Sequence, residues 1–202
     1  IQPLIYDLDT ITLDLFGFSV DSVWVENETI NDFSYDGRFI NIPVMDEIDS
    51  KTSVIISVFY HGTPSSDPKW GGFYFKDNVA YNMGVGMRSY PHGVGRFWYP
   101  CVDNFVDRAT YDYFIRIPEN YIAVCPGELK ETYLHKDSTV TWYWSLENNI
   151  PTYISSVAIA EYEVIRDTLN GIERMIPSSV YVRPGLKNKA DSSFSEIEEY
   201  LT

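Results

Sequence analysis

Residues 95–104 read GRFWYPCVDN, a run in which three consecutive aromatic side chains precede a proline and a cysteine. Such a run lowers solubility wherever it is exposed, so the fold must either bury it or use it as a binding surface. The residues themselves leave three interpretations open: a ligand platform, a redox or metal site, or a part of the scaffold. The rest of the sequence is needed to choose among them.

The composition is that of a folded, acidic protein. The chain has 202 residues, of which 45% are hydrophobic and 16% aromatic, which is typical of one domain with a sizeable core rather than of a disordered segment. Asp and Glu number 29 against 15 Lys and Arg, so the formal net charge is −14. Because this charge repels phosphate groups, nucleic acid and anionic membrane surfaces are not expected as partners. No apolar run approaches the ~20 residues of a membrane span.

Alternation of hydrophobic residues predicts strands through most of the chain. In residues 54–60 the side chains of Val54, Ile56, Val58 and Tyr60 fall on one face, a pattern with a period of two. Further strands are expected at residues 111–117, 139–144, 154–162 and 180–182. The sequence therefore predicts an all-β sandwich or saddle of mostly antiparallel sheets.

A hairpin and a short helix are expected near the C-terminus. Asn170-Gly171 lies between residues 164–165 and 172–175, and this dipeptide is typical of a tight β-hairpin turn. Beyond Pro184-Gly185, apolar residues recur at helical spacing, at Ala190, Phe194, Ile197 and Leu201. One apolar stripe on a helix this short needs a partner to cover it. That partner is either the sheet of this domain or a following domain that is absent here.

The cysteines and histidines do not form a recognisable metal motif. Cys101 and Cys125 read either as two buried thiols or as a disulfide, and a disulfide would imply an oxidising compartment. His61, His92 and His135 are scattered, and none lies in an H-E-x-x-H motif. We therefore expect no zinc site made by this chain.

Two other candidates each have a functional and a structural interpretation. Residues 70–75, WGGFYF, could present rings to a sugar, or form a strand whose glycines allow close backbone approach. Asp103, Asp107 and Arg108 could supply paired carboxylates for acid–base chemistry, although loop carboxylates are mostly solvated or capping groups. The structural interpretation is favoured for both.

A series of short motifs then occurs in an order that resembles the N-terminal β-domain of aminopeptidase N-like zinc metallopeptidases, the family that includes leukotriene hydrolase. The motifs are Y-H-G-x-P at 60–64, W-G-G-F at 70–73, W-Y-P-C-V-D at 98–103, R-A-T at 108–110, P-E-N-Y-I-A-V at 118–124, G-E-L at 127–129 and P-T-Y-I at 151–154. By this resemblance the opening run, 95–104, is mostly core, beneath a loop that faces the active-site cleft.

The resemblance also implies a domain organisation. Residues 1–184 correspond to the N-terminal β-domain, and residues 185–202 to a linker and the start of the first helix of the catalytic domain. The family's zinc motif and its exopeptidase loop belong to that next domain. The chain alone is therefore expected to hold no cofactor and to be inactive, with zinc bound by the absent catalytic domain.

One position departs from the family pattern. The family's N-terminal domain usually contributes a glutamine or glutamate that holds the free amine of the substrate, nine residues before the proline of the P-C-x-D segment. In this chain Pro91 stands there, between Tyr90 and His92. A proline side chain has no hydrogen-bond acceptor. By the resemblance, Tyr90, Pro91 and His92 face the cleft. Because Pro91 lacks the acceptor, we expect the full-length protein to be an atypical aminopeptidase.

The functional prediction is a non-catalytic domain that walls the cleft of a zinc-dependent peptidase and shapes access for the substrate N-terminus. Its expected partners are its own downstream catalytic domain and, in the full enzyme, a peptide substrate. The alternative is a stand-alone β-sandwich that binds carbohydrate or protein. A secreted or periplasmic location is favoured over others.

Overall fold

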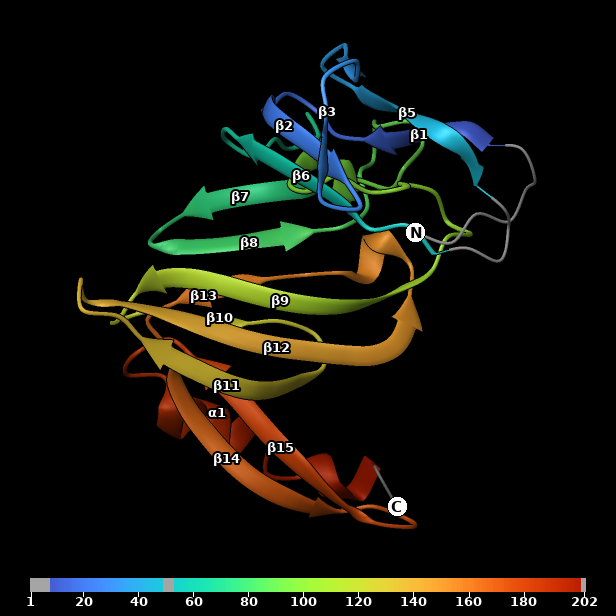
Figure 1. The fold of residues 1–202 in the computed structure, drawn as a ribbon. Helices are drawn as coiled ribbons and strands as arrows, with labels where there is room; N and C mark the ends of the chain where they lie inside the picture. Colours follow the sequence, from blue (N-terminus) through green and yellow to red (C-terminus); the bar gives the residue numbers. More distant parts are fainter. Residues whose placement is uncertain (1–7, 49–52, 201–202) are drawn as a thin grey trace.

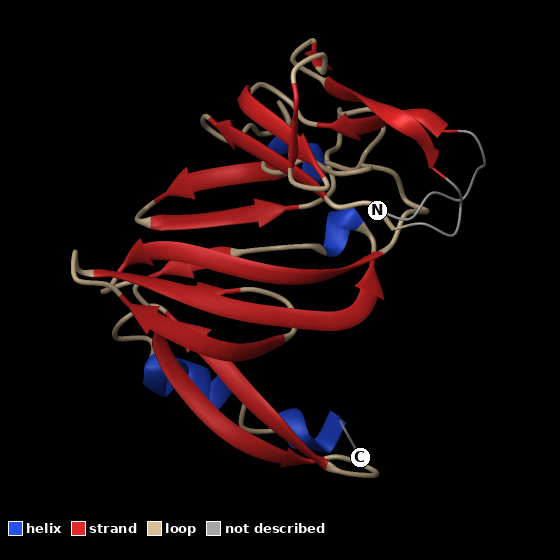
Figure 2. Ribbon diagram, viewed as in Figure 1, coloured by secondary structure: helices blue, strands red, loops and turns tan. Residues whose placement is uncertain are grey.

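The computed structural model describes residues 8–48 and 53–200. Within these residues every strand pairing is antiparallel, and one short α-helix lies near the C-terminus (Figures 1 and 2). Strands β1 to β6 lie at one end of the molecule, the β14–β15 hairpin lies at the other, and the remaining strands lie between them (Figure 1). The prediction of an all-β architecture is confirmed.

The N-terminal part consists of two three-stranded sheets, with the orders β1–β5–β4 and β3–β2–β6. Their strands are β1 (Leu8–Asp14), β2 (Ser19–Val25), β3 (Glu28–Ile30), β4 (Ser34–Tyr35), β5 (Phe39–Ile48) and β6 (Ile56–His61). Side chains from both sheets meet in one hydrophobic cluster, in which Leu15, Val23, Ile40 and Ile42 have no exposed surface. The period-two pattern of the sequence therefore buries one face of each sheet, as expected.

The middle part has a four-stranded sheet, β10–β13–β8–β7, and a three-stranded sheet, β11–β12–β9. The strands are β7 (Gly72–Lys76), β8 (Val79–Met83), β9 (Ala109–Pro118), β10 (Ile122–Val124), β11 (Glu128–Leu134), β12 (Thr139–Ile150) and β13 (Ala158–Ala160). Tyr113 pairs with Trp144 on the buried face, where both join a second cluster with Phe73. On the outer face Phe114 stacks on Tyr143, with centroids 4.3 Å apart.

The strand expected at residues 154–162 is much shorter than the sequence predicts. A 3₁₀ helix, η2 (Thr152–Ile154), comes first, and only β13 (Ala158–Ala160) is extended and paired. The reason is the side chain of Asn82, which donates to the carbonyl of Ser155 at 3.0 Å and accepts from the amide of Val157 at 2.6 Å. An amide side chain thus takes the hydrogen bonds that a neighbouring strand would otherwise make.

The hairpin near the C-terminus is confirmed as β14 (Glu163–Asn170) and β15 (Met175–Val182). Its loop is longer than an Asn-Gly turn, because the amide of Gly171 donates to the carbonyl of Arg174. The helix is shorter than expected: α1 (Lys187–Ser193) is followed by a 3₁₀ turn, η3 (Ile197–Tyr200), while Leu201 lies outside the described residues.

Helix α1 packs against the β14–β15 hairpin, and Ala190 is buried there (Figure 1). The sequence left two possible partners for the apolar stripe, the sheet of this domain and a following domain. The sheet of this domain covers the first residue of the stripe, Ala190. Phe194 remains 46% exposed.

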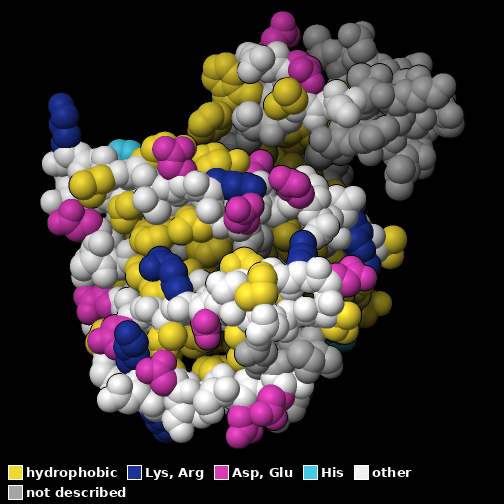
Figure 3. Space-filling model, turned by 90° about the horizontal axis from the view of Figure 1, so that it is seen from below, with side chains coloured by type: hydrophobic (Ala, Val, Ile, Leu, Met, Phe, Trp, Pro, Cys, Tyr) yellow, Lys and Arg dark blue, Asp and Glu magenta, His cyan; other side chains and the backbone are white. Residues whose placement is uncertain are grey.

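The surface near this hairpin mixes both signs of charge. On the face seen from below in Figure 3, the Lys and Arg side chains are interspersed with Asp and Glu and separated by hydrophobic patches. Among the described residues, no helix has the length and apolar character required to cross a membrane.

The two faces of the β11–β12–β9 sheet should respond differently to truncation. Trp144 is 6% exposed and its indole N–H donates to the carbonyl of Ala123 at 2.9 Å, whereas Phe114 on the opposite face is 60% exposed. We expect Trp144→Ala to lower the free energy of unfolding by about 3–5 kcal/mol, and Phe114→Ala by less than about 1 kcal/mol. Urea unfolding measures both. Equal losses would show that the assignment of the two faces is wrong.

Candidate cleft-facing site

The loop that carries Tyr90, Pro91 and His92 is anchored at its start by Asp67. The carboxylate of Asp67, 4% exposed, accepts hydrogen bonds through Oδ2 from the amide of Arg88 (2.9 Å) and from the amide and hydroxyl of Ser89 (2.6 and 2.7 Å). Its Oδ1 accepts from the amides of Lys69 and Trp70, at 2.9 and 3.1 Å. One buried carboxylate therefore joins two loops.

Hydrogen bonding decides the charge state of Asp67. Burial alone would raise the pKa of this carboxyl, but the hydrogen bonds from Ser89 and from the backbone amides outweigh burial and hold the pKa well below its ordinary value. Asp67 is therefore a carboxylate at every pH above its ordinary titration range.

The W-G-G-F segment beside Asp67 has the structural role favoured from the sequence. Gly71 has φ +101°, and a Cβ added there would lie 2.1 Å from the carbonyl oxygen of Val85. Gly72 has φ +100°, and a Cβ added there would likewise collide with the backbone of Ser66. Only glycine fits such a close backbone approach. Phe73, which follows, is buried in the second cluster.

The other end of the loop is held by Arg96. Its Nη2 donates to the carbonyl of Pro91 at 2.7 Å, and its Nη1 lies 3.7 Å from a carboxylate oxygen of Asp103 and 3.8 Å from one of Asp14. Asp103, 2% exposed, also accepts from the amide of Arg96 (3.2 Å) and the hydroxyl of Thr152 (2.8 Å). This network joins β1, the loop and η2.

Asp14 is the more exposed acid of the network. Burial raises the pKa of the Asp14 carboxyl, and the amide of Asp103 and the guanidinium of Arg96 oppose that rise. The amide of Asp103 donates to Asp14 at 3.1 Å. Asp14 thus connects strand β1 to the motif segment through both charge and a hydrogen bond.

Between these anchors the loop closes on itself and presents one ring. The amide of Gly86 donates to the carbonyl of His92 at 2.8 Å, and His92 Nδ1 lies 3.0 Å from the carbonyl oxygen of Gly86. The bond between Tyr90 and Pro91 is cis. Tyr90 is 86% exposed, and its ring meets that of His92 edge-on at 6.2 Å. The carbonyl of Pro91 is already used by Arg96, so the side-chain polar groups that the loop exposes are the hydroxyl of Tyr90, the imidazole of His92 and the guanidinium of Arg88.

The opening run, residues 95–104, is mostly core, as the sequence analysis expects. Gly95, Arg96 and Phe97 form the 3₁₀ helix η1 (Gly95–Phe97) and are buried, as are Cys101 and Asp103. The preference for a solvated or capping Asp103 is wrong, because this carboxylate is buried against a guanidinium and a hydroxyl. Asp107 and Arg108 are exposed and lie in the following loop.

The two cysteines are free thiols, and the disulfide considered from the sequence is not formed. Cys125 belongs to the second hydrophobic cluster, whereas Cys101 bridges by its backbone to Asp14 in the N-terminal part. Burial raises the pKa of the Cys125 thiol to about 12, and burial also raises that of Cys101. Both thiols therefore stay protonated at neutral pH and act as small apolar groups.

The three histidines lie in different parts of the structure, each with its own partner. His61 contacts Asp21 on the N-terminal sheets, His92 contacts Gly86, and His135 contacts Thr141 near the end of β11. Among residues 8–48 and 53–200, no three His, Cys, Asp or Glu side chains are grouped so as to hold a metal ion. The donors within these two ranges therefore do not fit a zinc site.

Sequence reasoning did not single out Asp67, Arg96 or Thr152 as members of the site. Two signals were available. Asp67 precedes Pro68 in a turn-forming segment, and Arg96 is the one charged residue between the glycine and the aromatic run. An isolated charge within an apolar run is worth testing as a buried ion pair, since a charge is rarely buried without a partner.

Solved structures that share this fold include M1 zinc metallopeptidases and an aminopeptidase. An M1 zinc metallopeptidase from Deinococcus radiodurans, bound to a Tyr-Ser-Ala substrate, matches 88% of this chain and 40% of its own with a TM-score of 0.77 and 19% identity. Aminopeptidase A from Legionella pneumophila, in complex with aspartic acid, matches 95% of this chain and 22% of its own, with a TM-score of 0.79 and 18% identity. The chain therefore has the fold of part of these enzymes, which confirms the resemblance to the N-terminal β-domain at the level of the fold.

The sequence comparison points to a different kind of protein. Transcription initiation factor TFIID subunit 2 is 36% identical over 75 residues in Gallus gallus and 33% identical over 111 residues in Danio rerio. These matches cover 36% and 51% of this chain, but only 6% and 9% of the relatives. The chain thus spans less than a tenth of the length of the curated relatives that it matches. No family model matches the chain.

The carboxylate of Asp67 should make stability depend on pH. The pKa of Asp67 is lower in the folded state than its ordinary value of 3.8, so its contribution is fully present above that pH and is lost as the pH falls toward the folded pKa. In Asp67→Asn the side-chain NH₂ would face amide donors instead. We expect Asp67→Asn to be less stable than wild type at pH 7, with the difference shrinking below pH 3.8.

Thermal unfolding between pH 2.5 and 7 measures this difference, with Asp32→Asn, at an exposed position, as the control. A difference between wild type and Asp67→Asn that stays constant with pH would contradict the assignment.

The Arg96 network should be costly to break and partly recoverable. Arg96→Met leaves the buried Asp103 without its cation, and we expect a loss of about 3–5 kcal/mol in the free energy of unfolding. Adding Asp103→Asn should recover part of that loss, because the orphaned charge is removed. Urea unfolding of wild type, the two single variants and the double variant gives the coupling energy between Arg96 and Asp103.

The exposed ion pair between Arg116 and Asp137 provides the matched control. Arg116→Met should cost less than about 1 kcal/mol. If Arg96→Met costs no more than Arg116→Met, the buried network does not hold the fold together.

Proposed function

We propose that this chain is the non-catalytic N-terminal β-domain of a zinc-dependent peptidase of the aminopeptidase family. The observation that carries the proposal is the fold similarity to M1 zinc metallopeptidases over nearly the whole chain, in enzymes of which the chain spans less than half. Residues 1–184 would form the domain, and residues 185–202 would lead into the catalytic domain. In that enzyme the domain walls one side of the active-site cleft.

The bracing of the 86–92 loop supports this role. A wall that shapes substrate access has to keep its geometry in the absence of substrate, and Asp67 and Arg96 fix both ends of the loop by buried hydrogen bonds. Tyr90 is then presented to solvent from a fixed backbone. The loop would limit which N-terminal residues fit, and would exclude water from that side of the cleft.

Zinc enters the proposal through the rest of the protein. The histidines described above do not fit a zinc site, so the ligands would be supplied by the downstream domain. When bound there, zinc activates a water molecule for attack on a peptide carbonyl. The residues of this chain would contribute position and shape.

A second candidate function is that of a non-hydrolytic assembly subunit. It is favoured by the sequence relatives, which are subunits of a transcription initiation factor, and by Pro91, which removes the side-chain acceptor expected for a substrate amine. In such a protein the same fold would serve as a scaffold, and Tyr90 would face a partner protein instead of a peptide substrate.

Kinetics of the full-length protein distinguish the two functions. We compare matched peptides with free and acetylated N-termini, for wild type and Pro91→Glu. Losing one hydrogen bond to a charged group costs about 1.5–3 kcal/mol, or one to two decades in selectivity. We therefore expect weak preference for free amines in wild type and a stronger preference in Pro91→Glu, with Val106→Glu, an added carboxylate at another exposed loop position, as the control.

Two results would contradict the proposal. A strong wild-type preference that Pro91→Glu leaves unchanged would show that this position does not read the amine. Absence of zinc-dependent hydrolysis in a folded, zinc-supplemented full-length protein would favour the assembly subunit instead.

A further inference from the structure

A hollow between the N-terminal sheets and the middle of the molecule is separate from the 86–92 loop. Its volume is about 570 Å³, within the range of about 300–1,000 Å³ typical of small-molecule sites. The walls come from segments far apart in the chain: β1, the start of β6, residues 99–102, the start of β9 and η2. The middle of this wall is the Pro100-Cys101-Val102 segment of the aromatic run.

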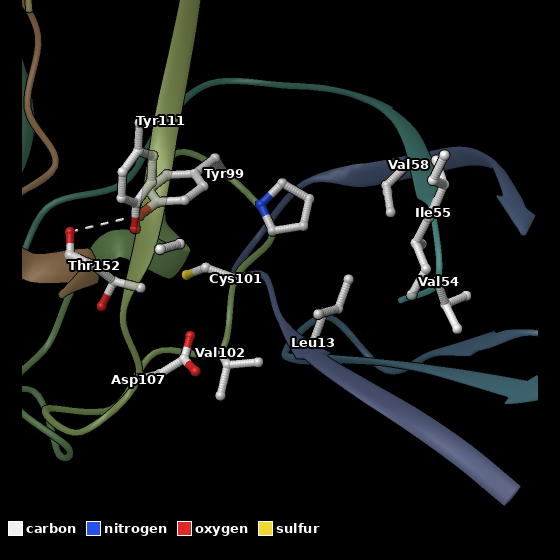
Figure 4. Close-up of a pocket in the computed structure, with 13 residues that line it drawn as sticks. Leu13, Val54, Ile55, Val58, Tyr99, Cys101, Val102, Asp107, Tyr111 and Thr152 are labelled. Carbon is white, nitrogen blue, oxygen red and sulfur yellow. Dashed lines mark hydrogen bonds between the residues drawn. The ribbon is translucent and has the colours of Figure 1, made fainter. Parts of the chain in front are cut away.

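One side of the hollow is aliphatic. Figure 4 shows Leu13, Val54, Ile55 and Val58 together on one side, opposite Tyr99, Tyr111 and Thr152. Ile55 is 63% exposed although it borders this concave surface. Leu13 and Val54 are already buried, so an alkyl chain lying along this side would remove mainly the surface of Ile55 and Val58 from water, which is favourable.

The opposite side is rich in hydrogen-bond acceptors. The hydroxyl of Tyr99 lies 3.3 Å from that of Tyr111, and donates to the carbonyl of Thr152 at 3.5 Å. With the Tyr99 proton directed at Thr152, the Tyr111 proton is directed at Tyr99. Burial raises the pKa of Tyr111, so its hydroxyl is neutral at pH 7. Lone pairs are therefore what this side offers to a ligand.

Among the described residues that line the hollow, the one charged side chain is negative. Asp107 borders the hollow beside Val102 (Figure 4), and no Lys, Arg or His lines it among the described residues. The neighbouring Arg108 directs its guanidinium to the carbonyls of Phe105 and Asp107, at 3.3 and 3.5 Å. None of the ion pairs of the described residues involves the Asp107 carboxylate. A carboxylate or phosphate ligand would be repelled, whereas a cationic donor meets complementary charge.

We propose that this hollow binds a small aliphatic primary amine, with its alkyl chain against Leu13 and Val58 and its ammonium group at Asp107 and the tyrosine hydroxyls. An alkylammonium ion matches the apolar wall with its chain, and the acceptors and the carboxylate with its charged donor group. A fatty acid has the wrong charge, and a sugar has no alkyl chain for the apolar wall. This inference does not depend on the proposed function, because the hollow and the 86–92 loop are lined by different residues.

The test uses the 202-residue chain and three probes with the same number of carbon atoms: octylamine, octanol and octanoate. Isothermal titration calorimetry at pH 7 should show saturable 1:1 binding of octylamine, about tenfold tighter than octanol and tighter still than octanoate. Nα-acetyl-lysine methylamide carries the same ammonium group on a peptide unit. It should bind at least tenfold more weakly than octylamine, and equal binding would overturn the assignment to a small amine in favour of a protein lysine.

Variants locate the two ends of the ligand. Asp107→Asn should weaken octylamine about tenfold and leave octanol unchanged, while Asp112→Asn, on the outer face of β9, should change neither. Val58→Trp should fill the hollow and abolish binding of both. If Val58→Trp does not fold, methyl NMR of wild type replaces it: octylamine should shift Leu13 and Val58 and leave Leu169, in the C-terminal hairpin, in place.

Besides equal binding of the lysine analogue, three results would overturn the proposal. These are octanoate binding as tightly as octylamine, Asp107→Asn binding octylamine as wild type does, and methyl shifts that leave Leu13 and Val58 unmoved.

Discussion

The buried ion pair between Arg96 and Asp103 is the constraint on which the arrangement of this molecule depends. Taking two charges out of water is costly, and the cost is offset only where further hydrogen bonds satisfy both groups. Here the carbonyl of Pro91 and the hydroxyl of Thr152 supply them. Asp14 of β1 adds a second carboxylate beside Arg96. These partners belong to separate segments, so the pair is satisfied only when β1, the loop and η2 are all in place.

The aromatic run, residues 95–104, lies between two features of the structure, the 86–92 loop and the hollow. Its buried members pack beneath the 86–92 loop, and its last residues, from Pro100 to Asp103, divide that loop from the hollow. Cys101 contributes an apolar, protonated thiol to this division, since burial raises its pKa. A disulfide at Cys101 would tie the dividing segment to the second cluster, whereas with a free thiol the segment is joined to β1 by backbone hydrogen bonds between Cys101 and Asp14 and by the Asp14 carboxylate.

The strands could be predicted from the sequence because their signal is local. Tyr113 and Phe114 are adjacent residues, and a period of two is enough to put one in the core and the other in solvent. The short β13 could not be predicted, because its length depends on Asn82, more than 70 residues away in the chain. The same holds for the site. Pattern and resemblance pointed to Tyr90, Pro91 and His92, but the anchors of their loop are long-range hydrogen bonds that leave no local period.

The low sequence identity to the structural neighbours is consistent with the physics of this fold. A sheet core accepts many combinations of apolar side chains, provided that volume and alternation are kept, so the architecture persists while most residues change. Positions such as Gly71 and Gly72 are different, because a Cβ there would collide with backbone that cannot move aside. The residues that maintain the fold are therefore different from those that could set the function. The glycines, the Arg96 network and the alternation maintain the scaffold, while the loop tip, with Tyr90 exposed and Pro91 partly buried, can change chemistry without disturbing it, because its backbone is already held from both ends.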